Sequence, residues 1–276
     1  MTKKSNSGLP ARKNMPARVV LSASYSTAKL VENGTAMTAA LTNDNVTQDG
    51  SIFRITGASY RTDNLVIPDV AAYFKGPPTP GSGITVGEAD KVAWRDPATG
   101  YECIMLRSEE QGYRSGYVGV QTGHPMHGFH HNAIPEDLGV EVHGGLSYSA
   151  MCKVDVQGDT SIAREARRIC HTVIPAKAAS TYATAYRVQD RHAWWFGFDC
   201  NHLFDIIPAL MNRRRLEFLE AESQAEYRND DYVCLEILNL ARQLKAIEDG
   251  LPPPDREGYP LPPAGSDPAN LFKREK

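Results

Sequence analysis

The sequence predicts an α+β fold, in which a mixed, largely antiparallel sheet is followed by a C-terminal amphipathic helix. Short β-branched and aromatic runs separated by Gly, Pro and Asp begin near residue 91, as expected for antiparallel strands. Residues 230–249 place apolar side chains at helical spacing. The chain has 276 residues, of which 41% are hydrophobic, and this is enough to build a sizeable core.

The first third of the chain is less strongly patterned. Residues 1–50 are expected to be a low-complexity N-terminal segment, because Ser, Thr, Ala and Asn dominate and sustained apolar periodicity is missing. Residues 51–90 are expected to form a small extension of extended or short helical pieces, which ends in the linker KGPPTPGSG. The main domain, residues 91–250, should carry the site, and a Pro-rich tail, residues 251–276, should be extended or disordered.

Within the main domain, five segments are predicted to be strands, and a short helix is expected in TSIAREARRICHTVIP before the last of them. The five are VAWRD, YECIML, GYVGV, GVEVHGGL (139–146) and AWWFGF (193–198). The C-terminal helix is indicated by one apolar face formed by Val233, Ile237, Leu240, Ala241, Leu244 and Ile247. Asp230 is a candidate cap at its start, and Gly250 with the prolines after it ends the helix.

Composition and missing motifs argue against several classes of protein. The net charge of -3 gives no general attraction to nucleic acid. No window approaches the roughly 18–20 apolar residues of a membrane span, and MTKKSNSGLPARKN lacks the apolar centre of a signal peptide, so we expect a cytoplasmic location. The five cysteines are odd in number without CxxC pairing, so we expect reduced thiols. The motifs GxxxxGK[ST], GxGxxG, HExxH and GxSxG are absent.

Clustered histidines are the clearest indication of a functional site. All eight lie between residues 124 and 202, and imidazole is both an acid–base group near neutral pH and a common metal ligand. His124 directly follows a predicted strand, whereas the other histidines of GHPMHGFHHN fit a solvated loop equally well. His143 ends EVHGGL, where two glycines let a ligand approach closely. In the alternative, the glycines only make a turn and His143 is a half-buried polar residue.

The segment WWFGFDCNHLFD leads from an aromatic strand into a helix predicted to begin at Cys200 or Asn201. Asp199, His202 and Asp205 then share one helix face, where they could bind a divalent metal such as zinc or manganese, or act as acid and base. In the alternative, Asp199 is only an N-cap and Asp205 a solvated residue. Cys200 is a weaker candidate, either a nucleophile at the helix start or buried filler.

The candidate residues fall into three sets. The catalytic set is His143, His202 and Asp199. The metal set is His124, His143, Asp199, His202 and Asp205. The substrate-binding set, chosen because cations and aromatic rings can contact a phosphate or stack on a base, is Arg107, Arg114, Tyr117 and Trp195. The alternative for this last set is a structural or solvated role.

Several segments together resemble a family of uncharacterised proteins encoded by tailed bacteriophages and prophages. They are AWRDPATGYECIMLR, GYRSGYVGVQTGHPMHG, VEVHGGLSYS, WWFGFDCNH and NDDYVCLEILNLARQL. The resemblance covers residues 91–247. By analogy with small phage proteins directed at host defence, it implies an accessory protein of the infected bacterial cytoplasm that acts on a nucleotide signal.

Three functions follow as expectations. The first is a phosphodiesterase-like hydrolase of a nucleotide immune signal, in which a metal or histidine activates water and Arg107 or Arg114 stabilises developing charge. The second is a homo-oligomeric protein that sequesters a small nucleotide without chemistry, with Tyr117 and Trp195 in its pocket. The third is a virion or host-interaction protein that attaches through its terminal segments. In none of them does the chain bind membranes or nucleic acid in general.

Overall fold

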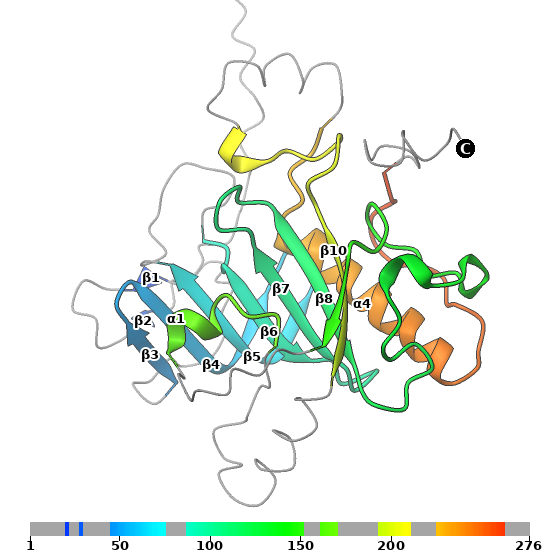
Figure 1. The fold of residues 1–276 in the computed structure, drawn as a ribbon. Coiled ribbons are helices and arrows are strands. Elements are labelled where there is room, and N and C mark those ends of the chain that lie inside the picture. The colour runs from blue at the N-terminus through cyan, green and yellow to red at the C-terminus, as the bar shows by residue number, and fades with distance from the viewer. Residues whose placement is uncertain are drawn as a thin grey trace, which may run out of the picture.

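The computed structural model describes residues 45–75, 87–151, 161–170, 193–210 and 225–262. It also describes the backbone of two short paired strands, β1 (Val20–Leu21) and β2 (Ala28–Lys29). An eight-stranded antiparallel sheet carries helix α4 (Asp230–Glu248) on one face (Figure 1). The predicted α+β class, with a largely antiparallel sheet and a C-terminal helix, is confirmed.

The order of strands in the sheet is β3-β4-β5-β6-β7-β8-β10-β9. The bounds are β3 (Val46–Asp49), β4 (Ile52–Arg61), β5 (Val66–Lys75), β6 (Lys91–Arg95), β7 (Glu102–Arg107), β8 (Arg114–Val120), β9 (Tyr148–Met151) and β10 (Trp194–Asp199). The first six strands follow one another as a meander, whereas β10 inserts between β8 and β9. Residues 121–147 therefore connect β8 to β9 across the position that β10 occupies, and this connection contains His143.

Both faces of the sheet are buried, which explains why the strands are nearly continuous apolar runs. Alternate side chains join different clusters because successive residues of a strand point to opposite faces. One face packs against the apolar side of α4 through Val92, Trp94, Cys103, Met105, Val118, Phe196 and Phe198. On the opposite face lie Ala93, Ile104, Tyr117 and Trp195, and farther along it the short helix α1 (Ile162–Glu165) covers β4 and β5. The predicted helix in this region is confirmed.

The segment 139–146, predicted as a strand, is irregular, and this prediction is wrong. Its backbone is bonded to side chains of α4 rather than to a neighbouring strand. The Glu141 N–H donates to Gln243 Oε1 at 2.9 Å, and Gln243 Nε2 donates to the Glu141 carbonyl at 3.0 Å. The amide of Gln243 thus satisfies both backbone groups of Glu141, as a paired strand otherwise does.

Helix boundaries also differ from the prediction. No helix begins at Cys200 or Asn201, because β10 is followed by a loop and then by the 3-10 helix η3 (Pro208–Leu210). Two more 3-10 turns, η1 (His131–Ala133) and η2 (Glu136–Leu138), lie between β8 and β9. Asn229, not Asp230, caps α4, since its side chain accepts the Tyr232 N–H at 3.0 Å. Asp230 is buried and accepts the Tyr60 hydroxyl instead.

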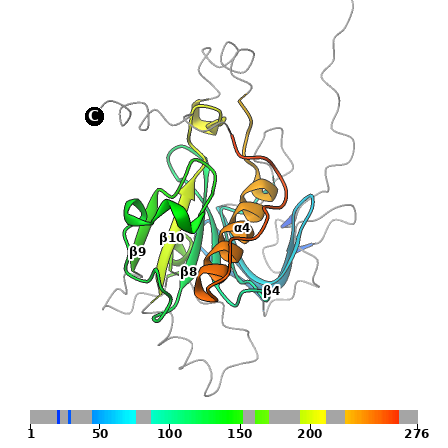
Figure 2. The ribbon, with the colours of Figure 1, turned by 90° about the vertical axis from the view of Figure 1, so that its right-hand side faces the viewer.

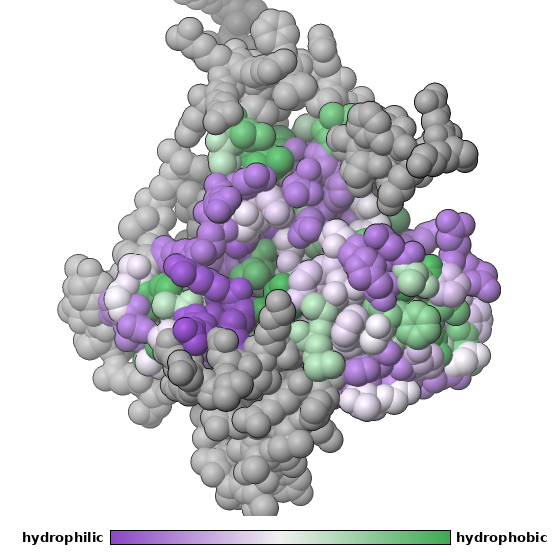
Figure 3. All heavy atoms as spheres, in the orientation of Figure 1, coloured by the Kyte–Doolittle hydropathy of each residue, from purple (hydrophilic) through white to green (hydrophobic). Residues whose placement is uncertain are grey.

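The sheet extends across the boundary suggested at residue 90, because β5 pairs with β6. Most of the expected linker lies outside the described residues. Residues 251–262, which we call the C-terminal strap, return along α4 (Figure 2). On the face drawn in Figure 3, apolar residues are exposed on the lobe formed by residues 121–147, where Phe129 is 45% exposed. No helix in the described ranges has both the length and the apolar character to cross a bilayer.

Candidate functional site

Three side chains from two loops meet beside the N-terminal half of α4. The Nε2 atom of His143 lies 2.7 Å from Oδ2 of Asp205, a residue 62 positions away in the sequence. The Nδ1 atom of His202 lies 3.4 Å from the same oxygen. One ligand atom from each residue falls within 4.8 Å of the others, so the group could hold a metal ion. We call these three residues the histidine–aspartate group.

A turn brings His202 and Asp205 together. The His202 N–H donates to Asp205 Oδ2 at 2.9 Å, and the Asp205 N–H donates to the His202 carbonyl at 3.0 Å. A backbone bridge between Asp205 and Glu226 holds this turn. The Glu226 N–H donates to the Phe204 carbonyl, and the Ile206 N–H donates to the Glu226 carbonyl. The i, i+3 spacing noted in the sequence therefore works through a turn rather than through a helix.

Gly144 lets the imidazole of His202 lie directly against the backbone. A Cβ atom built on Gly144 would come within 2.0 Å of His202 Cε1, and the φ of Gly144 is +65°. Both observations require glycine, because other residues carry a Cβ and avoid positive φ. The two glycines after His143 were expected to admit a ligand. At Gly144 the group that approaches is the side chain of His202.

Helix α4 and the residues before it hold the group in place. The hydroxyl of Tyr232 lies 2.8 Å from His143 Nδ1, and Glu236 Oε2 accepts the His143 N–H at 3.0 Å. Arg228 Nε donates to the second oxygen of Asp205 at 2.9 Å, and its guanidinium stacks over the Tyr232 ring at 4.7 Å. These partners resemble the outer layer of a metal site, in which a ligating histidine is oriented through its other ring nitrogen.

Sequence reasoning missed these partners, although a signal was present. The residues Tyr232, Glu236, Asn239 and Gln243 recur at helical spacing and form a polar face of α4 beside its apolar one. All four are at least 97% buried. A polar face that is buried needs partners from another segment, and here the segment 139–143 and the strap supply them.

The group is closed to solvent and its charges are compensated. The side chains of His143, Asp205 and His202 are 0%, 1% and 9% exposed. Burial by itself raises the pKa of Asp205, but its contacts with His143 and His202 hold that pKa below its ordinary value. Because an ionised Asp205 only accepts hydrogen bonds, Nε2 of His143 carries a proton toward it, while Nδ1 shares a hydrogen bond with the Tyr232 hydroxyl.

His202 differs from His143 in one respect. Each ring nitrogen of His143 has a hydrogen-bond partner. The Nδ1 atom of His202 is buried and has no such partner among the described residues, because its 3.4 Å contact with Asp205 does not have hydrogen-bond geometry. A buried polar atom without a partner costs about 1–3 kcal/mol. The hydrogen bonds of the His143 ring are therefore satisfied, whereas Nδ1 of His202 is not.

Two residues of the predicted metal set lie outside the group. His124 joins the 121–147 connection to α4, because its Nε2 contacts the Leu244 carbonyl at 2.9 Å and its Nδ1 accepts the Met126 N–H at 3.0 Å. Burial lowers the pKa of His124. Asp199 accepts hydrogen bonds from the hydroxyls of Ser115 at 2.5 Å and Ser147 at 2.7 Å. Both residues thus have partners that account for them without a metal.

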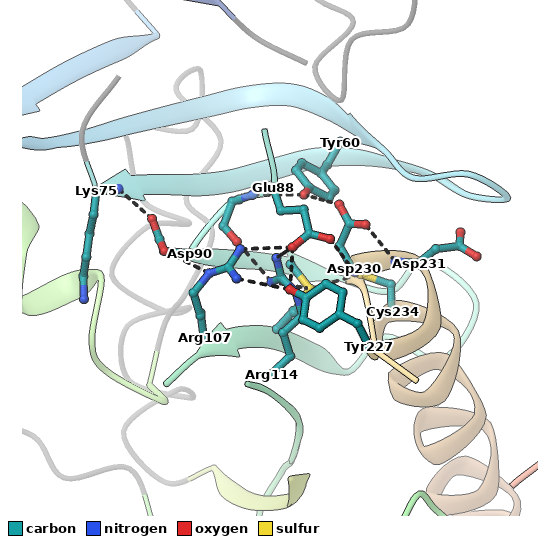
Figure 4. A network of polar contacts seen from close by, with 12 residues as sticks. Tyr60, Lys75, Glu88, Asp90, Arg107, Arg114, Tyr227, Asp230, Asp231 and Cys234 are labelled. Carbon is teal, nitrogen blue, oxygen red and sulfur yellow. Dashed lines mark hydrogen bonds and ion pairs between the residues drawn. The ribbon is translucent and has the colours of Figure 1, made fainter. Parts of the chain in front are cut away.

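The predicted arginines belong to a separate buried network (Figure 4). Arg114 is fully buried and donates to Glu88 Oε2 at 2.6 Å, and Arg107 pairs with the same oxygen at 3.1 Å. Tyr227 also donates to it, at 2.7 Å. Burial raises the pKa of Glu88, but the two arginines lower it to about 2. The network ties β7 and β8 to the segment before α4.

The predicted aromatic residues and Cys200 are buried as well. Tyr117 and Trp195 pack together on the face of the sheet opposite α4. Burial raises the pKa of the Cys200 thiol, which is the opposite of what a nucleophilic cysteine requires. Cys103, Cys200 and Cys234 are free, but Cys170 is disulfide-bonded, so the expectation of reduced thiols is wrong at Cys170. His171 and His192 lie outside the described residues.

Comparison of the chain with protein-family models, with curated proteins and with solved structures finds no match.

Proposed function

We propose that this chain is a divalent-metal hydrolase whose ion is held by His143, His202 and Asp205. The observation that carries the proposal is the buried Nδ1 of His202, which lacks a hydrogen-bond partner beside an ionised carboxylate. An ion between these atoms satisfies that nitrogen and stabilises the carboxylate. Two imidazoles and one carboxylate suit zinc, manganese or iron(II), and thiolates are not needed.

One of the two separations between ligand atoms fits an ion of this class, and the other is shorter than an ion requires. Zinc binds nitrogen and oxygen at about 2.0–2.2 Å, so two ligands of a tetrahedral ion lie about 3.3 Å apart. The observed separations from Asp205 Oδ2 are 2.7 Å to His143 and 3.4 Å to His202. Binding requires His143 Nε2 to give up its proton, as metal binding to histidine generally does. The 2.7 Å distance between His143 Nε2 and Asp205 Oδ2 must lengthen for the ion to enter.

A set of three protein ligands, which His143, His202 and Asp205 would provide, is typical of catalytic rather than structural zinc. A zinc ion held by these residues would supply a water of lowered pKa, which acts as a nucleophile near neutral pH. Arg228, which binds the second oxygen of Asp205, is the cation that we assign to an anionic substrate. The proposed substrate class is a nucleotide phosphodiester, and this part of the proposal rests on the resemblance to phage proteins.

The sequestering alternative finds less support in the described residues. It needs an accessible pocket of aromatic and cationic side chains, whereas Trp195 and Arg114 are fully buried and Tyr117 is 7% exposed. Arg107 is held by Glu88 and Asp90. A role in the virion or in host contact rests on the terminal segments, most of which lie outside the described residues.

The test begins with metal binding. Protein stripped with EDTA is titrated calorimetrically with zinc and manganese, and we expect one ion to bind the wild-type chain. The substitution His202→Ala should abolish binding, whereas His130→Ala, at an exposed histidine outside the group, should leave it unchanged. Failure of the wild-type chain to bind any divalent ion would sink the proposal, and the group would then be a structural link between the loops and α4.

The second stage identifies the reaction. The metal-loaded protein is incubated with cyclic di- and trinucleotides and ADP-ribose derivatives, with and without EDTA, and each compound is followed by mass spectrometry. Loss of one compound that EDTA prevents and His202→Ala abolishes would support the hydrolase and name its substrate. An ion that binds while every compound survives unchanged contradicts the proposed substrate class, and recovery of an intact bound nucleotide favours sequestration.

A further inference from the structure

The C-terminal strap runs back along α4 in the reverse direction. Its Leu251 N–H donates to the Ala246 carbonyl at 2.8 Å, near the end of the helix. Its Tyr259 hydroxyl donates to Asp231 at 2.9 Å, in the first turn. Between these ends, both backbone groups of Glu257 bond to the Asn239 amide, at 3.1 and 2.9 Å. The strap is therefore fixed to α4 along its length, as Figure 2 shows.

Arg256 of the strap contacts two groups that flank His143. One terminal nitrogen donates to the Glu141 carbonyl at 2.7 Å, two residues before His143. The other forms an ion pair with Glu236 Oε1. The same guanidinium thus reaches the backbone that leads into His143 and the helix side chain that binds it. Its side chain is only 19% exposed.

Glu236 transmits this contact to His143. Its Oε2 accepts the His143 N–H at 3.0 Å, and its Oε1 also accepts from Asn239 at 3.2 Å. The carboxylate is 2% exposed, and a buried carboxylate requires a cation or several donors to remain ionised. Within the described ranges, Arg256 is the cation that forms an ion pair with it. Without Arg256, Glu236 is left with two neutral donors.

From this geometry we infer that Arg256 is a positioning residue for the metal site, acting on His143 through Glu236 and through the Glu141 carbonyl. The inference rests on the proposed function, because it concerns the same ion. It assigns the strap a role in a site to which the strap contributes no ligand. Outer partners of metal ligands commonly determine affinity in this way.

The test compares Arg256→Gln with Arg242→Gln in the full chain. Arg242 is the matched control because it also binds the strap, through Glu257, while its hydrogen bonds go to Asn239 and the Leu238 carbonyl rather than to Glu236. Zinc affinity is measured by competition with a chelator, and melting temperature is measured separately. We expect Arg256→Gln to weaken zinc binding about 10- to 100-fold, with partial recovery in Arg256→Lys. Arg242→Gln should bind zinc like the wild-type chain.

Unchanged zinc affinity in folded Arg256→Gln overturns the inference, whatever happens to the melting temperature. Equal losses in both variants overturn it too, because they indicate general loosening of the strap. A second readout is independent of metal: hydrogen exchange of the His143 amide should accelerate more in Arg256→Gln than in Arg242→Gln, with a smaller increase in Arg256→Lys. If the wild-type chain binds no zinc, the proposed function fails, and the positioning of His143 by Arg256 stands or falls on this exchange measurement.

Discussion

The Cβ position of Gly144 lies 2.0 Å from Cε1 of His202, so the two loops of the histidine–aspartate group are in contact through a residue without a side chain. Gly145, the next residue, also has positive φ, at +86°, but no atom lies within 4 Å of its Cβ position. The two glycines share the backbone requirement and differ in what surrounds them. Substituting each of them separately distinguishes the effect of backbone strain at positive φ from the effect of a clash with His202.

Alanine at position 145 should cost about 1–2 kcal/mol of unfolding free energy from positive φ alone. Alanine at position 144 should lower the unfolding free energy by about 1–3 kcal/mol more than alanine at position 145 does, because its methyl group overlaps His202. Metal affinity should fall in Gly144→Ala and persist in Gly145→Ala. Urea denaturation and zinc titration of both variants provide the measurements. Equal behaviour of the two contradicts the contact described above.

Removing the charge of Asp205 should destabilise the fold even without metal. In Asp205→Asn, Arg228 loses one of its two carboxylate partners, and only one side-chain oxygen remains to accept from either Arg228 or Nε2–H of His143. Breaking a buried ion pair costs about 3 kcal/mol. The control is Glu226→Gln, which removes the other partner of Arg228 from a side chain that is 71% exposed. That change should cost less than about 1 kcal/mol in the same denaturation experiment.

Glu88 should make stability depend on acid pH. Its pKa is lowered from an ordinary 4.5 to about 2 in the folded chain. A lowered pKa contributes stability that is fully present above 4.5 and is lost as pH falls toward 2. The size expected from this shift is about 3 kcal/mol. Glu88→Gln should be less stable than the wild-type chain at pH 7, and the gap should narrow by pH 3. A gap that stays constant with pH argues against an ionised Glu88.

The cap of α4 gives a simpler prediction. Asn229 accepts the Tyr232 N–H, so Asn229→Ala should lower the unfolding free energy by about 1 kcal/mol, whereas Asn229→Ser should retain most of it. Tyr232 also orients His143, so fraying of this turn should weaken zinc binding in Asn229→Ala. Thermal denaturation and zinc competition on the same samples check both effects. An unchanged zinc affinity in Asn229→Ala would mean that the helix cap does not influence the proposed metal site.

The fold class and four of the eight strands of the sheet could be predicted because their signals are local. Strands β6, β7, β8 and β10 are short apolar runs bounded by turn residues, and α4 carries its apolar face in its own sequence. The segment 139–146 misled the prediction because Val140 and Val142 alternate as in a strand. Its hydrogen-bond partner is a helix side chain about a hundred residues away, and no local pattern reports that.

The candidate site could be predicted in part, because some of its residues carry local signals in the sequence. His143, His202 and Asp205 were selected from residue type and spacing, and the structure brings these three together. Asp199 and His124 were selected on similar grounds, but serine hydroxyls and backbone groups account for them. Arg228, Tyr232 and Glu236 were missed because their role depends on which loop packs against α4. That packing follows from the insertion of β10 between β8 and β9.

The order of segments along the chain also determines when the site can form during synthesis. The three residues of the histidine–aspartate group and all eight strands of the sheet precede α4, and Arg256 follows it. A growing chain can therefore pair its strands while one apolar face of the sheet still lacks its cover, and His143 has neither Tyr232 nor Glu236. Nascent chains released before about residue 230 should be prone to aggregate. Completion of α4 covers that face, and α4 with the strap supplies the partners of the histidine–aspartate group.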